Sequence, residues 1–326
     1  MNYRNRIRKI EKRLRNEDKS GSNSMHNNSE IIDKILNFKL SEVKDQLMNH
    51  YKINCTKNTY RSYLASYNNF IRFIGDKNIY SINRADLEDF KIKRSSEVSQ
   101  VSVNIDIRNL KAIFNKMVDY DLIEFSKFTG VKQFKIQNEE ILTIETVDLV
   151  KILYETKGDQ MNHIIRFTLL TACRISEVLD LKIKDIDFKN NNINIYQRKT
   201  NSYKSFPISD SLTGLLEEIL PPGSREDISL MKEGFLFYDK MKNDPGSKLR
   251  TDTISKKFKK IIRRLNLNSN YKFHSLRHTA ITEFMNKNVP PYIVQKIAGH
   301  SSINTTMLYS HARSEDMKIA VNSVSY

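Results

Sequence analysis

Apolar residues recur every three or four positions through most of residues 30–130, and this period predicts amphipathic helices. The clearest apolar stripe covers 57–74 and ends at Gly75, a residue type that readily terminates helices. Because such helices bury their apolar faces against one another, this half is predicted to be a small helical bundle with its aromatic residues in the core. The other helices are predicted over 31–51, which residues 37–40 can interrupt, from Asn83 or Asp86, and from Ser99 or Ser102.

The second half of the chain combines helices with one β region. Short segments with Asn-rich turns between them predict a small antiparallel sheet with strands at 186–188, 193–197 and 205–208. The predicted fold class is therefore mainly α with a small antiparallel β-sheet, an α+β arrangement. The helices of this half are predicted after a cap at Thr143, from Met161 to Leu170, over 252–265, from His274 to before Asn288, and over 292–298; a short helix capped by Ser301 or Ser302 follows.

Breaks in this periodicity divide the chain into two domains, a number that also fits its length of 326 residues. Residues 1–29 are predicted to form a basic N-terminal extension and linker, and 30–130 the helical domain. Residues 131–141 lack periodicity and are predicted to connect the two domains. The second domain is then expected to cover 142–326.

The net charge of the chain indicates a polyanionic partner. The chain has 54 Lys and Arg against 38 Asp and Glu, a net charge of +16, and a pI of about 9.6. Nucleic acid is the leading candidate, and a basic protein without such a partner is the alternative. Cys55 and Cys173 are the two cysteines, which argues against a disulfide framework and fits a reducing cytoplasm. We find no apolar run long enough for a membrane span and no secretory signal, so a cytoplasmic location is expected.

The side chains best suited to phosphate chemistry gather near the C-terminal end. His274, Arg277 and His278 occupy positions i, i+3 and i+4, so one helix face carries all three. His300 follows the next predicted helix, and Tyr309 lies nine residues further on. Because arginine presents a planar fork of donors to a phosphate and tyrosine can act as a nucleophile, this stretch is a candidate catalytic site.

Two further basic residues are candidates earlier in the chain. Arg174 stands in T-A-C-R-I-S-E-V-L, where Glu177 at i+3 can pair with it. Lys199 lies between the second and third predicted strands, in R-K-T-N-S-Y-K. Arg198 and Lys204 are the competing candidates in that segment.

These motifs, in this order and spacing, resemble those of the tyrosine recombinase (phage integrase) family. They are T-A-C-R-I-S-E-V-L, H-x-x-R-H, and A-G-H-S-S-I-N-T-T followed by a Tyr. The resemblance covers about 40–311 and is strong from 165 onward, although Ala172 replaces the family's usual Gly. It implies a helical core-binding (SAM-like) DNA-binding domain, followed by the catalytic domain of a simple, Xer-like site-specific recombinase. Such an enzyme integrates, excises or resolves a mobile element or replicon.

The resemblance also implies a role for each candidate residue. Tyr309 is the expected nucleophile, which forms a 3′-phosphotyrosyl intermediate, and Arg174 and Arg277 are expected to bind the phosphate. Lys199 is expected to protonate the leaving 5′-oxygen, and His274 and His300 to contact the phosphate or move protons. Glu177 is expected to orient an arginine and His278 to act as a brace behind the catalytic residues. No metal and no cofactor is expected, because the arginines supply the positive charge.

The expected partner is a double-stranded DNA recombination site, around which the two domains close as a clamp. In the family, a homotetramer assembles on two such sites, the segment after the nucleophile docks into a neighbouring subunit, and an accessory DNA-bending or directionality factor can take part. No membrane partner is expected. The expected location is the cytoplasm, in association with the nucleoid. The candidate phosphate contacts are basic residues of the predicted helices: Lys57, Arg61, Lys91, Lys93, Arg94, Arg108, Lys111, Lys256 and Lys260.

Two other classes of function compete with this interpretation. His274, His278, His300 and His311 could bind zinc, but the first pair lacks the Glu of H-E-x-x-H and no Cys lies near in sequence. A DNA-binding protein without catalysis would be expected to lack at least one of the catalytic residues. All six are present.

Overall fold

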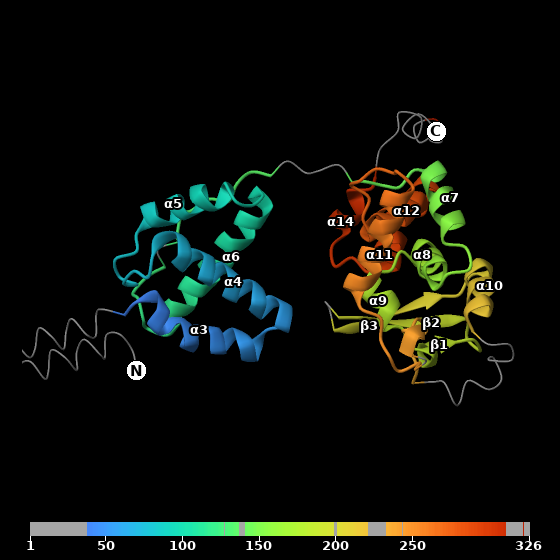
Figure 1. The fold of residues 1–326 in the computed structure, drawn as a ribbon, viewed down its shortest axis with the longest axis horizontal. Coiled ribbons are helices and arrows are strands. Elements are labelled where there is room, and N and C mark those ends of the chain that lie inside the picture. The colour runs from blue at the N-terminus through green and yellow to red at the C-terminus, as the bar shows by residue number, and fades with distance from the viewer. Residues whose placement is uncertain are drawn as a thin grey trace, which may run out of the picture. The chain divides into compact units, whose positions relative to one another are not determined.

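The structure is a computed structural model that describes residues 38–126, 128–136, 141–198, 201–220, 233–242, 244–310 and 322. The chain divides into two compact units, Met1–Asn138 (unit 1) and Glu139–Tyr326 (unit 2) (Figure 1). Among the described residues, no helix is long and apolar enough to cross a bilayer.

Unit 1 is the predicted bundle of amphipathic helices. Thr56, Asn83 and Ser99 accept hydrogen bonds from backbone N–H groups at the starts of three of its helices, and Gly75 ends one of them with a φ of 83°. The aromatic residues form its core, as predicted: Phe70, Phe90 and Phe114 are fully buried. The helices are α3 (Leu40–Asn54), α4 (Lys57–Ile74), α5 (Arg84–Ser95) and α6 (Gln100–Asp119).

Two boundaries of unit 1 differ from the prediction. Helix α3 begins at Leu40, after the expected interruption, and residues 31–37 lie outside the described residues. The predicted linker starts too early, because Val131 is only 1% exposed and Phe134 exchanges two hydrogen bonds with Asn104 of α6 (2.8 and 3.0 Å). Residues 131–134 therefore pack on unit 1.

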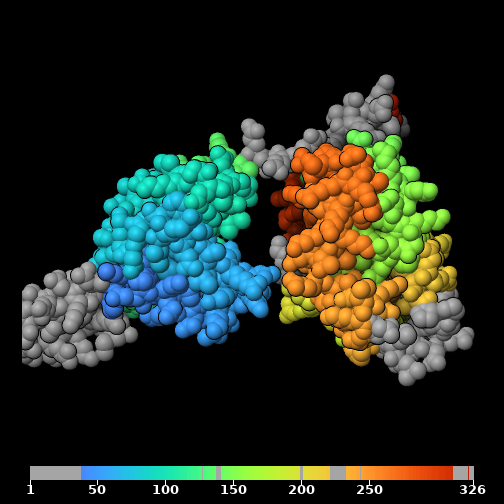
Figure 2. Space-filling model, viewed as in Figure 1, coloured from blue at the N-terminus to red at the C-terminus, as the bar shows by residue number. Residues whose placement is uncertain are grey.

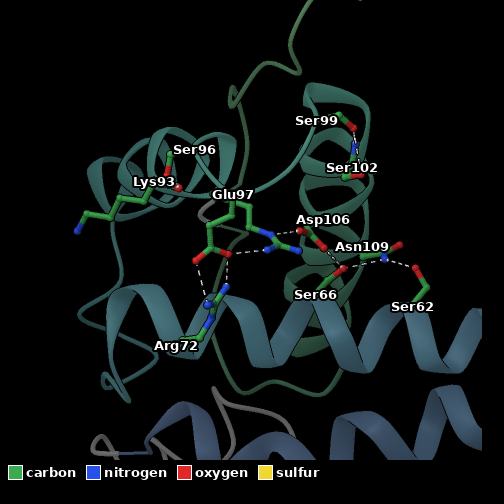
Figure 3. A network of polar contacts seen from close by, with 11 residues as sticks. Ser62, Ser66, Arg72, Lys93, Ser96, Glu97, Ser99, Ser102, Asp106 and Asn109 are labelled. Carbon is green, nitrogen blue, oxygen red and sulfur yellow. Dashed lines mark hydrogen bonds and ion pairs between the residues drawn. The ribbon is translucent and has the colours of Figure 1, made fainter.

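A polar network joins α4, α6 and the end of α5 (Figure 3). Arg94 donates to Asp106 and to Glu97, each at 2.9 Å, and Glu97 also accepts two bonds from Arg72. Asp106 accepts from the buried Ser66 at 2.6 Å. Since buried polar groups must be satisfied, this network fixes how the three helices pack.

Unit 2 is helical apart from one three-stranded antiparallel sheet in the order β1-β2-β3. Helix α8 lies near the middle of the unit, where α12 and α10 pack against it (Figure 1). The strands are β1 (Ile186–Asp187), β2 (Asn192–Gln197) and β3 (Ser202–Pro207). The helices are α7 (Thr146–Glu155), α8 (Gln160–Thr171), α9 (Ile175–Asp180), α10 (Asp210–Ile219), α11 (Thr251–Arg264), α12 (Phe273–Asn286), α13 (Pro291–Ala298) and α14 (Ile303–Met307), with 3₁₀ turns at Ile183–Asp185 and Lys240–Lys242.

Three details of unit 2 correct the prediction. Strand β3 begins at Ser202, three residues before the predicted start at 205. The prediction missed these residues because they are mostly exposed and polar and carry no apolar alternation. Thr143 does not cap α7, whose N-cap is Glu145. Helix α10, capped by Ser209, is an addition to the predicted elements. The mainly α fold with a small antiparallel sheet is confirmed.

Candidate active site

Arg277 is the buried centre of the site. It projects from α12 with only 2% of its surface exposed. Its Nη1 donates to the carbonyl of Ala172 (2.6 Å) and its Nη2 to that of Ala298 (2.7 Å), at the C-terminal ends of α8 and α13. Helix C-termini favour a cation there. Desolvation, and then the charge of Arg174, lowers the pKa of Arg277 to about 10, so it stays protonated at neutral pH.

Arg174 reaches the same site from the start of α9. Its Nη1 donates to Oε1 of Glu177 (2.8 Å), and its backbone N–H donates to Oε2 of that carboxylate (2.9 Å). Its Nη2 also donates to the carbonyl of Gly299 at 3.4 Å. Because Glu177 is buried and bonds to both ends of Arg174, it fixes the direction of the guanidinium.

Gly299 brings the end of α13 against the sheet. Its φ of 65° ends α13 in the left-handed conformation. A Cβ at this position would lie 1.8 Å from Nε2 of Gln197 on β2. Glycine therefore suits the backbone angle, and a larger residue would also have to displace the amide end of the Gln197 side chain. His300 follows directly from this turn.

Two histidines, His278 and His300, lie against Tyr309, and a third, His274, packs on His278. Nδ1 of His278 lies 2.6 Å from Oη of Tyr309. The ring of His300 is nearly parallel to that of Tyr309, with centroids 6.2 Å apart, and its Nδ1 lies 2.9 Å from Oγ1 of Thr306. His274 packs edge-on against His278, with ring centroids 4.6 Å apart.

Burial and neighbouring cations keep these side chains neutral. Desolvation, followed by the charges of His278, Arg277 and Arg174, lowers the pKa of His274 to about 4, although part of the ring remains accessible. Desolvation, followed by the charges of Arg277 and Arg174, lowers the pKa of His300 to about 4. Desolvation and the charge of Arg277 also lower the pKa of His278. Burial raises the pKa of Tyr309, against the opposing effect of both arginines.

The site therefore carries surplus positive charge. Two guanidiniums, Arg174 and Arg277, meet one directly bonded carboxylate, Glu177, within the part of the chain that the structure describes. A buried cation without a carboxylate partner favours the arrival of an anion. The planar donors suit a phosphate group.

The family comparison agrees with this geometry. Residues 142–316, more than half of the chain, match the phage integrase family, and 42–124 match the phage integrase N-terminal SAM-like domain. The chain belongs to the phage integrase family.

Relatives and solved structures extend the match. A probable integrase/recombinase protein of Methanocaldococcus jannaschii is 33% identical over 191 residues, which is 56% of each chain. A tyrosine recombinase of Pseudothermotoga lettingae is 22% identical over 292 residues, covering 87% of this chain and 97% of the relative. The matches to the first two relatives span little more than half of their lengths, 56% and 57%.

Two solved structures share the fold of this phage integrase. The lambda integrase dimer bound to a COC′ core site has a TM-score of 0.72 and 16% identity, covering 88% of this chain and 81% of that one. The Tn1549 transposon integrase in complex with transposon right-end DNA has a TM-score of 0.71 and 20% identity, covering 88% and 99%.

The structure brings five of the six predicted catalytic residues together in this integrase. Lys199 lies outside the described residues. Its two competitors have structural partners: Nε of Arg198 pairs with Asp180 at 2.5 Å, and Nζ of Lys204 donates to the carbonyl of Ile297 at 2.6 Å. His278 is placed differently from its predicted role as a brace, because it is the histidine that contacts the hydroxyl of Tyr309.

Sequence reasoning missed the partners that hold these side chains. Arg277 bonds to backbone carbonyls, which leave no mark in a sequence. Thr306, the partner of His300, is fully buried within an otherwise exposed segment, 301–308, and that burial could not be inferred from its type. His311 of the zinc alternative lies outside the described residues, and within those residues no group of three or more His, Cys, Asp or Glu could hold a metal ion.

The candidate DNA contacts divide into exposed and engaged groups. The exposed candidates in unit 1 are Lys57, Arg61 and Arg108. In unit 2 the exposed candidates are Lys256 and Lys260, both on α11, which forms part of the orange surface of unit 2 in Figure 2. Lys111 is engaged within unit 1, because its Nζ donates to the carbonyl of Val131 (2.7 Å), and its role as a DNA contact stays a prediction. Arg94 belongs to the polar network, and Lys91 lies 4.6 Å from the centre of the Phe134 ring. Lys93 is exposed.

Proposed function

We propose that this phage integrase is a site-specific DNA recombinase that cuts and rejoins duplex DNA through a 3′-phosphotyrosyl bond to Tyr309. The observation that carries the proposal is a carboxylate-poor arginine pair, the buried Arg277 and the half-buried Arg174, beside a tyrosine hydroxyl. A phosphodiester supplies the missing negative charge, and its phosphorus is a target for the phenol oxygen.

In the proposed reaction, Oη of Tyr309 bonds to phosphorus and the bond from phosphorus to the 5′-oxygen breaks. Arg174 and Arg277 stabilise the charge on the non-bridging oxygens, and Glu177 keeps Arg174 in direction. His274 and His300 line the phosphate position. We assign the proton for the leaving 5′-oxygen to Lys199, because Arg198 and Lys204 have partners of their own. Attack by the freed 5′-hydroxyl reverses the step and rejoins the strand.

The proposed partner is a pair of duplex DNA sites held by four copies of the chain. The net charge of +16 and the exposed basic residues of both units support contact with the phosphate backbone. The solved structures with this fold include a lambda integrase tetramer bound to a Holliday junction and the XerH recombinase bound to its difH substrate. We propose integration, excision or resolution of a mobile element or replicon as the biological outcome.

Covalent trapping tests this function and recovers the DNA site in the same experiment. The full-length protein is mixed with sheared genomic DNA from its source, denatured with detergent, and the DNA that remains attached to protein is sequenced. We expect one enriched sequence with two related half-sites, because a symmetric pair of subunits reads symmetric DNA. Absence of any covalent adduct, or equal recovery by Tyr309→Phe, would reject the function.

A further inference from the structure

The hydroxyl of Tyr309 has one hydrogen-bond partner among the described residues, Nδ1 of His278 at 2.6 Å. Tyr309 is 6% exposed, so water does not compete freely for this contact. His278 follows directly after Arg277, whose two bonds to helix ends fix this turn of α12. The packing of α8, α12 and α13 therefore fixes the His278 side of the contact.

The phenol is the donor in this hydrogen bond. Burial raises the pKa of Tyr309 and lowers that of His278, so both side chains are neutral at pH 7. A neutral imidazole offers one acceptor nitrogen, and a phenol is a much stronger acid than the N–H of a neutral imidazole. Nδ1 of His278 therefore accepts from Tyr309, and Nε2 carries the ring proton.

In the phosphotyrosyl ester, the phenol oxygen carries no proton. The covalent step therefore needs a group that accepts the phenol proton. A base must lie within about 2.6–3.2 Å of that proton's oxygen. Nδ1 of His300 faces Thr306, and His274 packs on His278 rather than on Tyr309. The cations Arg174 and Arg277 cannot accept a proton.

Resting on the proposed function, we propose that Nδ1 of His278 takes the proton of Tyr309 during attack and returns it during rejoining. The O–H bond of Tyr309 and the bond from phosphorus to the 5′-oxygen break, while the Nδ1–H bond and the bond from Oη to phosphorus form. The leaving oxygen receives its proton separately, from Lys199. The groups that face the imidazolium among the described residues are Tyr309, His274 and Arg277, none of which is an anion before the attack. The phosphodiester is therefore the anion that offsets its charge.

His278→Gln tests this assignment, because glutamine can accept the hydrogen bond but cannot take the proton. The probe is a nicked duplex that carries the site recovered by covalent trapping. We expect adduct formation to slow by about a hundredfold, the scale of a lost general base, with DNA binding retained. Its rate should rise about tenfold per pH unit between about pH 6 and 9, because the phenolate must then form without help. The wild-type rate should level off above the pKa of His278.

A 5′-bridging phosphorothiolate separates the base from the acid. Its sulfur leaves without protonation, so this substrate should rescue Lys199→Ala but leave His278→Gln slow. His163→Gln, on α8 and near Glu218 rather than Tyr309, is the matched control and should behave as wild type. Rescue of His278→Gln by this substrate, or a wild-type rate and pH profile, would overturn the assignment while the adduct itself upheld the recombinase. A wild-type protein that forms no adduct rejects the proposed function instead.

A measurement on the intact wild-type protein keeps the test independent of the folding of any variant. In ¹⁵N NMR of labelled histidines, His278 should have an unprotonated Nδ1, and its signal should shift in Tyr309→Phe. A protonated Nδ1 in the free protein would contradict the proposed direction of transfer.

Discussion

Each unit of the molecule contains two arginines close to carboxylates, and the two clusters differ in charge balance. In unit 1, Arg72 and Arg94 meet Glu97, and Arg94 also bonds to Asp106 (Figure 3). Two cations face two anions, and the network is closed by hydroxyl and amide groups. This network therefore needs no further anion to balance its charge.

The cluster in unit 2 is left short of one negative charge. Arg174 bonds to Glu177, but Arg277 is held by the carbonyls of Ala172 and Ala298. Backbone carbonyls satisfy the hydrogen bonds of a guanidinium without neutralising it. A pair of arginines in a hydrogen-bonded cluster therefore does not by itself identify a site. The unbalanced charge is what distinguishes a phosphate site from a structural brace.

The largest expected effect comes from Arg277→Lys, which keeps the charge but loses the fork. Single-turnover cleavage of the nicked site should fall at least about a hundredfold, the scale of a lost oxyanion donor. Arg94→Lys is the matched control in unit 1 and should lower the free energy of unfolding by about 1 kcal/mol with little change in cleavage. Near-normal cleavage by Arg277→Lys would make Arg277 a structural residue.

Removing one carboxylate from each cluster sharpens the same contrast. Glu177→Gln loosens the direction of Arg174 and should slow cleavage by about tenfold to a hundredfold, since small misplacements are costly in catalysis. Asp106→Asn leaves Arg94 and Ser66 less well paired, and should lower the free energy of unfolding by about 1–3 kcal/mol in urea titrations. If the two changes had the same effect on cleavage, the distinction between the clusters would be lost.

The pH dependence of stability should reflect two partly desolvated histidines of unit 2. His274 and His300 have a pKa of about 4 in the folded protein against 6.5 ordinarily. Between these values the unfolded chain binds more protons, so the free energy of unfolding is highest above about pH 6.5 and falls as the pH drops towards 4. Thermal melting across this range should show the loss, and His300→Asn should flatten it. An unchanged slope in that variant would contradict the burial of a neutral His300.

Ala172→Gly should have the smallest effect. Ala172 has a φ of 51° and a buried methyl group. Relief of left-handed strain, about 1 kcal/mol, opposes the loss of about 0.8 kcal/mol from the methyl and the entropy of an added glycine. The free energy of unfolding should change by less than about 1 kcal/mol, with cleavage unchanged because Arg277 bonds to the backbone. A large loss of cleavage would show that the methyl positions this turn.

Local spacing explains what could be predicted from the sequence. The pairing of Arg174 with Glu177 follows from their separation of three residues, and the end of α13 follows from Gly299. The contact between His278 and Tyr309 joins residues 31 positions apart, and the bond from Arg277 to Ala172 spans 105. Both of these long-range contacts depend on how the helices of unit 2 pack against one another. No local pattern could supply them.

Peptide mapping of the trapped adduct tests the central claim most directly. The covalent complex with the recovered site is digested with protease and nuclease, and mass spectrometry locates the attached nucleotide. We expect a nucleotide joined through its 3′-phosphate to the hydroxyl of Tyr309, and no adduct in Tyr309→Phe, which should still bind the DNA. A nucleotide on Tyr292 or Tyr271, or an adduct that persists in the Phe variant, would contradict it.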